Sequence, residues 1–374
     1  MGSVFQFPYR TVAEVHLRSL IRNLVTLRSL SKKEVIPVIK ADAYGHGMIP
    51  IAKALVHRGS CHTLSVATLE EAIELRKKIP YAISIIVLSG FVPHQLDAYV
   101  KHRLIPMIHS LSHLKSLQNR KVLPDIHLKI DSGMHRLGLL PEEIPEAIRT
   151  LQKMEIKLSG LATHFAESES MTSAFTNEQI KLFEEVKIQL FENRLLHTDC
   201  KIHVANSGAA LMEKLGSSVA IRPGLALYGI SPNPRISNGD SLIPILEWKA
   251  RVIGVKTIIK GDSVGYGRTY RPKKKEKIAI VAIGYADGFP RILSNRGRVL
   301  AGGRIEEVVG TVSMDLTTID ATGNPNIREG SLVTLIGKDS KNEATAWDMA
   351  NQAGTIPYEI LCGISQRVPR VYID

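Results

Sequence analysis

Long hydrophobic runs are absent from the 374-residue sequence, and cysteines are scarce. The longest nearly unbroken apolar stretch, IAIVAIGYA at 278–286, is far too short to cross a bilayer. The N-terminus lacks a basic segment followed by an apolar stretch, so no secretory signal is evident. The three cysteines, Cys61, Cys200 and Cys362, have neither metal-ligand spacing nor the even number of a disulfide set. We therefore expect a cytoplasmic protein with no membrane segment and no metal site.

Acidic residues are outnumbered, with 36 Asp and Glu against 48 Lys and Arg, for a net charge of +12. A basic surplus can attract nucleic acid, but these charges are mostly dispersed along the chain. The one dense run, RPKKKEK at 271–277, lies between two strand-like segments, where a solvated loop is the usual explanation. No nucleic-acid motif accompanies the charge. We expect no nucleic-acid partner, and only a mild attraction for anionic small molecules.

Between about residues 34 and 230, short β-branched apolar runs alternate with amphipathic stretches. Helical patterns are predicted at 69–79 and 177–195, the latter with apolar residues at three- and four-residue intervals. Near-continuous apolar strands separated by helices are typical of a parallel sheet that is covered on both faces. Eight β/α units over about 200 residues fit a closed (β/α)8 barrel of the TIM type better than an open sheet. The eight runs are 35–42, 64–68, 83–90, 103–109, 125–131, 157–165, 202–207 and 219–224.

The pattern changes after ISPNPRISNGD at 230–240, a loop rich in Pro, Gly, Asn and Ser. Closely spaced strands follow, interrupted by one helical stretch at 345–354, which predicts a second, mostly antiparallel β domain. We place the barrel at 11–238 and the C-terminal β domain at 239–374. In this division VAEVHL at 12–17 opens the barrel domain, and residues 1–10 are available to pair with the β domain.

Lys40 ends the first predicted barrel strand, within VIKADAYGHG. In barrels of this kind the reacting groups project from the C-terminal ends of the strands. A lysine that its neighbours partly desolvate there offers a neutral, nucleophilic amine, which can form a Schiff base with an aldehyde cofactor. Position alone is weak evidence, because a surface lysine at a strand end is the more common explanation. The assignment therefore depends on the neighbouring segments.

Those segments supply groups that suit a phosphate. Tyr44 lies beside two glycines, and a phenol next to permissive backbone can hydrogen-bond a phosphate oxygen. Barrels commonly hold phosphate after strands seven and eight, through loop amides and the N-terminus of a short helix. Strand seven ends in HVANSGAAL with the Ser207 hydroxyl, and strand eight ends in IRPGLALYG with the amides of Gly224 and Leu225. Together with the strand-one lysine, these loops predict a pyridoxal phosphate pocket.

Nine segments resemble alanine racemases, in that family's order, from about residue 10 to the C-terminus. They are VIKADAYGHG, HLKIDSGMHRLG, GLATHFAESE, HVANSGAAL, IRPGLALYGISP, VGYGRTY, IGYADGFPR, VVGTVSMD and GTIPYEILCGISQRVPRVY. The resemblance covers both predicted domains and implies the same fold, a barrel followed by a β domain. It implies that the chain interconverts L-alanine and D-alanine by two-base proton transfer on a pyridoxal phosphate aldimine, and supplies D-alanine for peptidoglycan.

The resemblance also implies roles for single residues. Lys40 holds pyridoxal phosphate and is one acid/base group, and Tyr266 in VGYGRTY is the other, contributed by the partner subunit. Two groups are needed because one proton leaves one face of the planar carbanion and another arrives on the opposite face. A free phenol has a pKa of about 10, so it needs cationic or hydrogen-bonding help to act as a base. His164 and Arg222 match the residues that give the tyrosine this help in the family, and His203 matches a residue that supports these two.

Arg222 bears on the choice of reaction. Most pyridoxal enzymes place an acid at the ring nitrogen and so make the cofactor a strong electron sink. An arginine keeps its own proton, so a ring nitrogen that faces it stays unprotonated. A cofactor that is a weaker electron sink favours prompt reprotonation of the substrate carbanion over transamination. Outside this motif, a salt bridge is the ordinary alternative for an arginine at a strand end.

Substrate-binding residues follow from the same resemblance. Arg136, in DSGMHRLG, grips the substrate carboxylate with its planar fork of donors, and the backbone amide of Met314 assists from the partner subunit. Asp315 is a supporting residue. Tyr358 caps the phosphate and, with Tyr285, crowds the substrate side chain, which disfavours groups larger than methyl by about 1–3 kcal/mol.

Three further positions are compared with the family's pattern. Lys129 aligns with a lysine that some members carry in carbamylated form, where the modified group positions the carboxylate-binding arginine. An ordinary buried salt bridge is the alternative for Lys129. Ser313 stands where many relatives have cysteine, and Thr311 stands where an arginine often lines the access channel. The second change bears on access to the site and on substrate range.

The resemblance implies a homodimer with shared sites, because Tyr266, Met314 and Tyr285 reach into the neighbouring barrel in this family. A broad-specificity amino-acid racemase of the same fold is the nearest alternative, although the Tyr358 cap and the lack of a signal sequence favour the narrow activity. A decarboxylase with a related barrel fits the VGYGRTY and GTIPYEIL segments less well. A non-catalytic pyridoxal phosphate carrier also has a strand-one lysine, but such carriers lack a C-terminal β domain.

Overall fold

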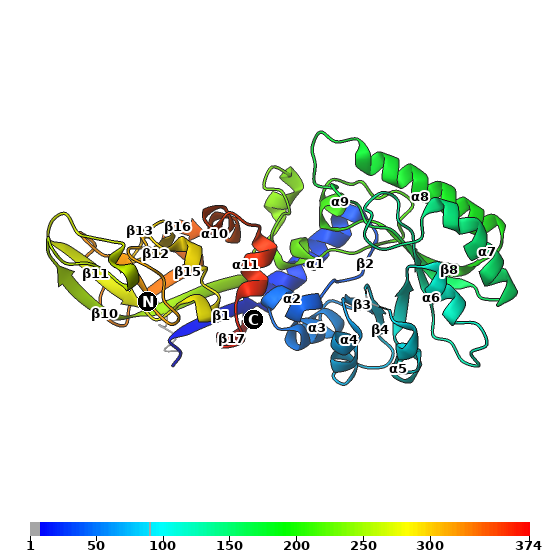
Figure 1. Cartoon of the computed structure of the whole chain (residues 1–374), viewed down its shortest axis with the longest axis horizontal. Helices are drawn as coiled ribbons and strands as arrows, with labels where there is room; N and C mark the ends of the chain where they lie inside the picture. Colours follow the sequence, from blue (N-terminus) through cyan, green and yellow to red (C-terminus); the bar gives the residue numbers. More distant parts are fainter. Residues whose placement is uncertain (1–7, 90) are drawn as a thin grey trace. The chain divides into compact units, whose positions relative to one another are not determined.

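The computed structural model describes residues 8–89 and 91–374. The chain divides into two compact units. The barrel unit contains Arg18–Ala43 and Gly47–Pro244, and the β unit contains the chain up to Leu17, the short segment Tyr44–His46, and Ile245–Asp374. In Figure 1 the barrel unit consists of helices around short strands, whereas the β unit consists mainly of extended strands.

Eight parallel strands close into a ring in the barrel unit. Strands β3 to β8 pair in sequence order, and β9 pairs with β2. A bridge between Val38 and Ser65 joins the β2 segment to β3, and the Val219 N–H donates to the Ile202 carbonyl oxygen between β8 and β9. The expected (β/α)8 barrel is confirmed, and each strand overlaps one of the eight predicted runs. The strands are β2 (Glu34–Val35), β3 (Thr63–Val66), β4 (Ser84–Val87), β5 (Ile105–Ile108), β6 (His127–Lys129), β7 (Leu158–Ala162), β8 (Leu196–His203) and β9 (Ala220–Ile221).

Helices follow the strands around this ring (Figure 1). They bury apolar faces: in the first helix Leu20, Leu24 and Leu27 recur at helical spacing and are 0–1% exposed. Inside the ring, side chains from several strands, among them Ile86, Met107 and Ala162, meet in one buried cluster, so the barrel has a packed interior. The helices are α1 (Leu17–Ser31), α3 (Met48–His57), α4 (Leu69–Arg76), α5 (Leu96–His102), α6 (Leu111–Ser116), α7 (Ile144–Lys153), α8 (Phe175–Glu192) and α9 (Ser207–Leu211).

The β unit is built on a nine-stranded sheet. Its main path runs β13-β12-β15-β10-β1-β17, with β11 and β14 continuing from β10, and β16 pairing with β15. β1 and β17 are parallel, and the other strand pairs described in this sheet are antiparallel. The strands are β1 (Thr11–His16), β10 (Leu246–Ile258), β11 (Glu276–Val281), β12 (Arg298–Ala301), β13 (Arg304–Glu307), β14 (Thr317–Asp320), β15 (Leu332–Asp339), β16 (Asn342–Ala344) and β17 (Arg370–Ile373).

Two helices complete the β unit. The predicted helix at 345–354 is α10 (Ala346–Ala353), which begins with a capping box between Thr345 and Asp348. The second helix, α11 (Pro357–Gly363), is not foreseen in the sequence, although the proline at its first position is typical of a helix start.

The placement of VAEVHL at the opening of the barrel domain is wrong. β1 pairs with β10, from Thr11 opposite Ala250 to Val15 opposite Leu246, and it also pairs with β17. The alternating pattern of β1 is compatible with a strand of either domain, so only the long-range pairing shows to which domain β1 belongs. The β unit likewise resumes at Ile245 rather than at 239. Of residues 1–10, most lie outside the described residues, but the Arg10 carbonyl oxygen accepts the Arg251 N–H, 2.8 Å away.

None of the helices in the described part of the chain has the length and hydropathy that a membrane crossing requires.

Candidate active site

Lys40 begins a turn with an uncommon backbone. The four residues 41–44 all have φ between 52° and 55°, so α2 (Lys40–Gly45) is a left-handed turn rather than the end of a strand. This conformation costs a non-glycine residue about 1–2 kcal/mol. The expectation that the first strand runs to residue 42 is therefore wrong in its last part. Strained backbone of this kind persists only where surrounding contacts hold it, and it is common at functional sites.

Side-chain carboxylates hold the turn in place. Glu71, on α4, accepts the Ala41 N–H at 2.7 Å through one oxygen and the Ala67 N–H at 2.8 Å through the other. Asp42 accepts the Met48 N–H at 2.7 Å. The first bond satisfies a backbone donor of the turn itself, and the other two tie the turn to the segments before α4 and at the start of α3 (Met48–His57). Lys40 thus lies on a segment whose conformation is held by the carboxylates of Glu71 and Asp42.

The loops that follow β8 and β9 are joined by one hydroxyl. Ser207 Oγ accepts the N–H of Gly224 at 3.0 Å and that of Ala226 at 3.2 Å, and all three residues are buried. Ser207 opens α9, and Leu225 opens the short 3-10 turn η3 (Leu225–Tyr228). The structure thus brings together the predicted phosphate residues of these loops, and Gly224 donates to Ser207 itself.

Little space is left around the loops that Ser207 joins. A Cβ at Gly208 would lie 2.7 Å from Ser168 Oγ and 2.9 Å from the Glu169 nitrogen, so only glycine fits at the second position of α9. The side chain of Asn206 caps the same helix by accepting the Ala209 N–H at 3.0 Å.

Arg222 is buried beside β8 and β7 and, among the described residues, donates only to neutral groups. Its guanidinium donates to the Thr163 carbonyl oxygen at 2.7 Å and to Nδ1 of His203 at 2.8 Å, with Nδ1 of His164 at 3.4 Å. It makes no ion pair with a carboxylate among the residues that the structure describes, so the salt-bridge alternative is not observed. Burial lowers the pKa of Arg222 to about 10, which leaves it charged at neutral pH.

The two histidines beside Arg222 are neutral. Burial, then the positive charge of Arg222, holds the pKa of His203 and that of His164 well below the usual value. Because a guanidinium can only donate, Nδ1 of His203 must be the accepting nitrogen, and the ring proton is on Nε2. That nitrogen lies 2.8 Å from Nδ1 of His127, a residue that the sequence reasoning missed. The signal was present, since His127 and Lys129 share one face of β6.

Lys129 and Arg136 have no carboxylate partner in the part of the chain that the structure describes. Lys129 is 9% exposed, and burial, followed by the positive charges of Arg222 and Arg136, lowers its pKa to about 8. Within residues 8–89 and 91–374, neither side chain makes an ion pair, so the buried salt bridge considered for Lys129 is not present there. Asp131 instead accepts the backbone N–H groups of Gly133, His135 and Arg136 at 2.9–3.1 Å and shapes the loop that carries Arg136.

In the β unit, Tyr266, Tyr285 and Met314 lie on loops that are hydrogen-bonded to one another. The Tyr285 N–H donates to Ser313 and the Ala286 N–H to Met314, each at 3.0 Å. Tyr266 starts the turn η5 (Tyr266–Arg268), and its carbonyl oxygen accepts the Thr311 hydroxyl at 2.9 Å. These three residues, predicted to act on the substrate, are solvent-exposed, with Tyr266 at 75%, Met314 at 53% and Tyr285 at 43%.

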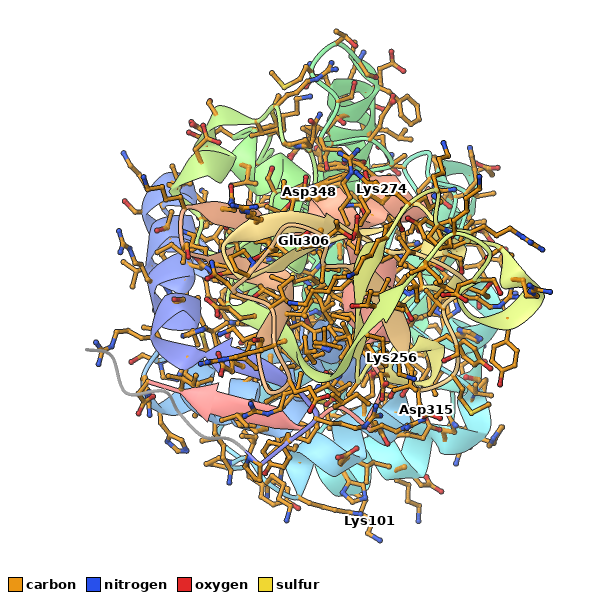
Figure 2. All side chains as sticks on the ribbon, turned by 90° about the vertical axis from the view of Figure 1, so that its left-hand side faces the viewer. Lys101, Lys256, Lys274, Glu306, Asp315 and Asp348 are labelled. Atoms are coloured by element: carbon orange, nitrogen blue, oxygen red, sulfur yellow. The ribbon has the colours of Figure 1, made fainter. Side chains whose placement is uncertain are left out.

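A charged network fixes these loops. Asp287, in the turn η6 (Tyr285–Asp287), is fully buried, caps the Gly284 N–H at 3.0 Å and pairs with Arg10. Arg367 lies 3.6 Å from Asp287 and 2.6 Å from Asp315, which is labelled in Figure 2. Asp315 is thus tied to the loop network. Asp287 lies within the segment IGYADGFPR but was given no role there, and Arg10 lies outside the recognised motifs.

Tyr44 and Tyr358 lie together in the β unit. Their ring centroids are 6.0 Å apart, and Tyr44 is 7% exposed. Burial, and then the neighbouring Tyr358 and Cys362, raises the pKa of Tyr44, so its phenol keeps its proton and can donate. Gly45 permits this packing, because a Cβ there would lie 2.2 Å from the Leu361 carbonyl oxygen.

Comparison with known protein families gives one family for both units. The model described as alanine racemase, N-terminal domain, matches residues 15–232, and the one described as alanine racemase, C-terminal domain, matches residues 245–372. The chain belongs to the alanine racemase family. An alanine racemase from Halothermothrix orenii is 40% identical over 372 residues, which cover 97% of this chain and 96% of the relative.

Solved structures of alanine racemases have the same fold. The alanine racemase from Bacillus anthracis with bound L-Ala-P has a TM-score of 0.89 at 32% identity, and the match covers 98% of this chain and 96% of that chain. The alanine racemase from Bartonella henselae with covalently bound pyridoxal phosphate has a TM-score of 0.87 at 32% identity, covering 98% of this chain and 100% of that chain. The predicted family and fold class are confirmed.

Proposed function

We propose that this chain is a pyridoxal-phosphate-dependent alanine racemase that uses Lys40 and Tyr266 as its two proton-transferring groups. The proposal rests most on Arg222, a buried cation that, within residues 8–89 and 91–374, donates only to carbonyl oxygens and neutral histidines. Such a group at the cofactor's ring nitrogen suits a reaction that returns the proton quickly. When bound, pyridoxal phosphate supplies a conjugated ring that withdraws charge from the substrate's α-carbon.

The residues present fit this cofactor. Ser207, Gly224 and Leu225 lie on loops after the last two strands, where barrels bind phosphate. Tyr44 supplies a protonated phenol, and Tyr358 packs against it. We assign these five residues to the phosphate. His164 and Arg222 are assigned to the cofactor ring, and His203 is assigned to supporting them.

On the substrate side, the guanidinium of Arg136 has no carboxylate partner in the described part of the chain and suits a substrate carboxylate. The amide of Met314 assists it, and Tyr285 limits the side chain to a small group. Lys129 has a lowered pKa and makes no ion pair with any described residue, which suits a carbamylated lysine that positions Arg136. Asp315 supports the Met314 loop through Arg367.

Proton transfer itself requires groups on two faces of the substrate. We assign the amine of Lys40 to one face and the hydroxyl of Tyr266 to the other. In each direction of the reaction one group accepts the α-proton and the other donates a proton, and the two exchange these roles in the reverse direction. Tyr266 is three-quarters exposed, as expected of a residue that works in the site of a partner subunit. The proposal therefore includes a homodimer, which supplies D-alanine for peptidoglycan in the cytoplasm.

One experiment tests the activity directly. Purified protein with pyridoxal phosphate is incubated with L-alanine in D2O, and D-alanine and α-deuterium are measured together by chiral chromatography and mass spectrometry. We expect both to appear with wild-type protein and neither with Lys40→Ala. L-serine and L-lysine, assayed side by side, distinguish the narrow activity from a broad-specificity racemase. Protein that binds the cofactor but leaves L-alanine unchanged would overturn the proposal and favour a carrier.

A further inference from the structure

A third buried histidine continues the contacts that begin at Arg222. His127, on β6, is 1% exposed, and His203, at the end of β8, is 0% exposed. Nδ1 of His127 lies 2.8 Å from Nε2 of His203, whose Nδ1 lies 2.8 Å from the Arg222 guanidinium. The three side chains thus form one continuous line of hydrogen bonds.

The direction of every proton in this line is fixed by its first member. Arg222 can only donate, so Nδ1 of His203 accepts and Nε2 carries the proton. That proton points at Nδ1 of His127, which must therefore be an unprotonated acceptor. Both rings are neutral in this arrangement. Burial, together with the positive charges of Lys201 and Arg222, lowers the pKa of His127 to about 3, in agreement with that state.

The backbone of the neighbouring strand is shaped to accept the His127 ring. Gly160, on β7, is paired with His127 in the strand register. A Cβ at Gly160 would lie 2.4 Å from three ring atoms of His127, including Nδ1. Any side chain at position 160 would push the imidazole away, so His127 and Gly160 form a matched pair. The ring centroids of His127 and His203 are 4.9 Å apart at an angle of 50°, so the ring position is defined on both sides.

We infer that His127 is a positioning residue for racemisation, which locks His203 in its Nε2–H tautomer and thereby orients Arg222. This inference rests on the proposed function. Without an acceptor at position 127, the Nε2–H of His203 would be buried and unsatisfied. The other tautomer of His203 would also leave a proton without an acceptor, because its Nδ1–H would face the N–H groups of Arg222. Arg222 would then shift away from its present orientation, in which it would face the ring of a bound cofactor.

The test compares two substitutions that differ in one acceptor. In His127→Asn the side-chain oxygen can take the place of Nδ1, whereas His127→Leu offers none. We expect kcat of the Leu variant to fall about 10- to 100-fold, the usual effect of removing the partner that fixes a histidine tautomer. KM for alanine should change less than about threefold, because Arg136 is untouched. The Asn variant should recover most of the lost kcat. His113→Leu, a half-buried histidine of α6 in the same unit, serves as the matched control and should keep kcat within about twofold.

Two further readouts separate positioning from packing. In 15N-histidine-labelled holoenzyme, NMR should show His203 as the Nε2–H tautomer in wild type and Asn variant, and an altered signal in the Leu variant. The absorption band of bound cofactor should shift in the Leu variant alone. Equal losses in Asn and Leu variants with unchanged spectra, or an unaffected Leu variant, would overturn the inference. Because the tautomer is read by NMR, it is tested even if wild type fails to racemise alanine, a failure that counts only against the proposed function.

Discussion

At the scale of single residues, three basic side chains of the barrel unit have no carboxylate partner among the described residues. Arg222, Lys129 and Arg136 all lack carboxylate partners in the described part of the chain, and Lys129 and Arg222 have lowered pKa values because they are buried. Uncompensated buried charge is costly, so Lys129 and Arg222 are expected to have a ligand or a modification, whereas Arg136 is exposed and can take its partner from solvent. The sequence motifs predicted these three residues, whereas His127 was missed because a polar residue within an apolar strand looks like an ordinary variation.

Reversing the charge at Arg222 should change the reaction. In Arg222→Glu a carboxylate replaces the cation, so the cofactor's ring nitrogen would become protonated and withdraw charge more strongly. We expect kcat for racemisation to fall at least about 100-fold, and pyruvate, the product of abortive transamination, to increase per turnover. Parallel assays of D-alanine and pyruvate on folded holoenzyme measure both. A variant with unchanged partition would show that Arg222 does not control the ring nitrogen.

Lys129 should react with carbon dioxide in a pH-dependent manner. Its pKa in the folded protein is lowered from the model-compound value of 10.5 to about 8, so the reactive neutral amine increases as pH rises through 8. In 13C-bicarbonate, a carbamate signal should be weak at about pH 6 and strong at about pH 9. The signal should vanish in Lys129→Ala, which should also raise KM for alanine through a less ordered Arg136. A signal that persists in this variant would place the carbamate elsewhere.

At the scale of elements, the strands and most helices follow local patterns, but three features do not. The left-handed turn α2 contradicts the intrinsic preference of Ala41, Asp42 and Ala43, and it is held by Glu71, which lies 30 residues along the chain and accepts the Ala41 N–H. β1 carries a pattern that suits either unit, so its sheet is decided by long-range pairing. α11 is too short for periodicity to identify it. Local sequence therefore predicts what local forces determine, and these three are determined elsewhere.

Glu71 should be a stabilising residue of the α2 turn. Glu71→Ala removes the acceptor of the Ala41 N–H and one half of the α4 capping box. We expect the free energy of unfolding to fall by about 1–2 kcal/mol and cofactor to be lost more readily on dialysis. Glu74→Ala, an exposed acid on the same helix, is the control and should have little effect in either measurement. Equal behaviour of the two variants in thermal unfolding would show that the turn does not need Glu71.

At the scale of the whole molecule, Lys40 is in the barrel part of the chain, and Tyr266 is in the β unit with a mostly exposed side chain. The fold class and the family were predictable because motifs are spread over the full length. The subunit origin of each site residue is not a property of local sequence, and it stays a prediction.

Mixing two inactive variants tests this sharing. Lys40→Ala and Tyr266→Ala each lack one proton-transferring group, but a heterodimer would contain one intact composite site. After random reassociation we expect roughly a quarter of wild-type activity, since half the dimers are mixed and each has one working site of two. Native mass spectrometry confirms that heterodimers form. Mixed dimers with no activity would assign Lys40 and Tyr266 to the same subunit.

The pairing of β1 with β17 has a consequence for synthesis of the chain. Ala13 is paired with Arg370, so one of the earliest described strands waits for the last one before its parallel edge is covered. A ribosome will have released every strand of the barrel before that partner emerges, and the barrel can close first. During translation β1 therefore remains an open edge, the part of a nascent chain that aggregates most readily or recruits a chaperone.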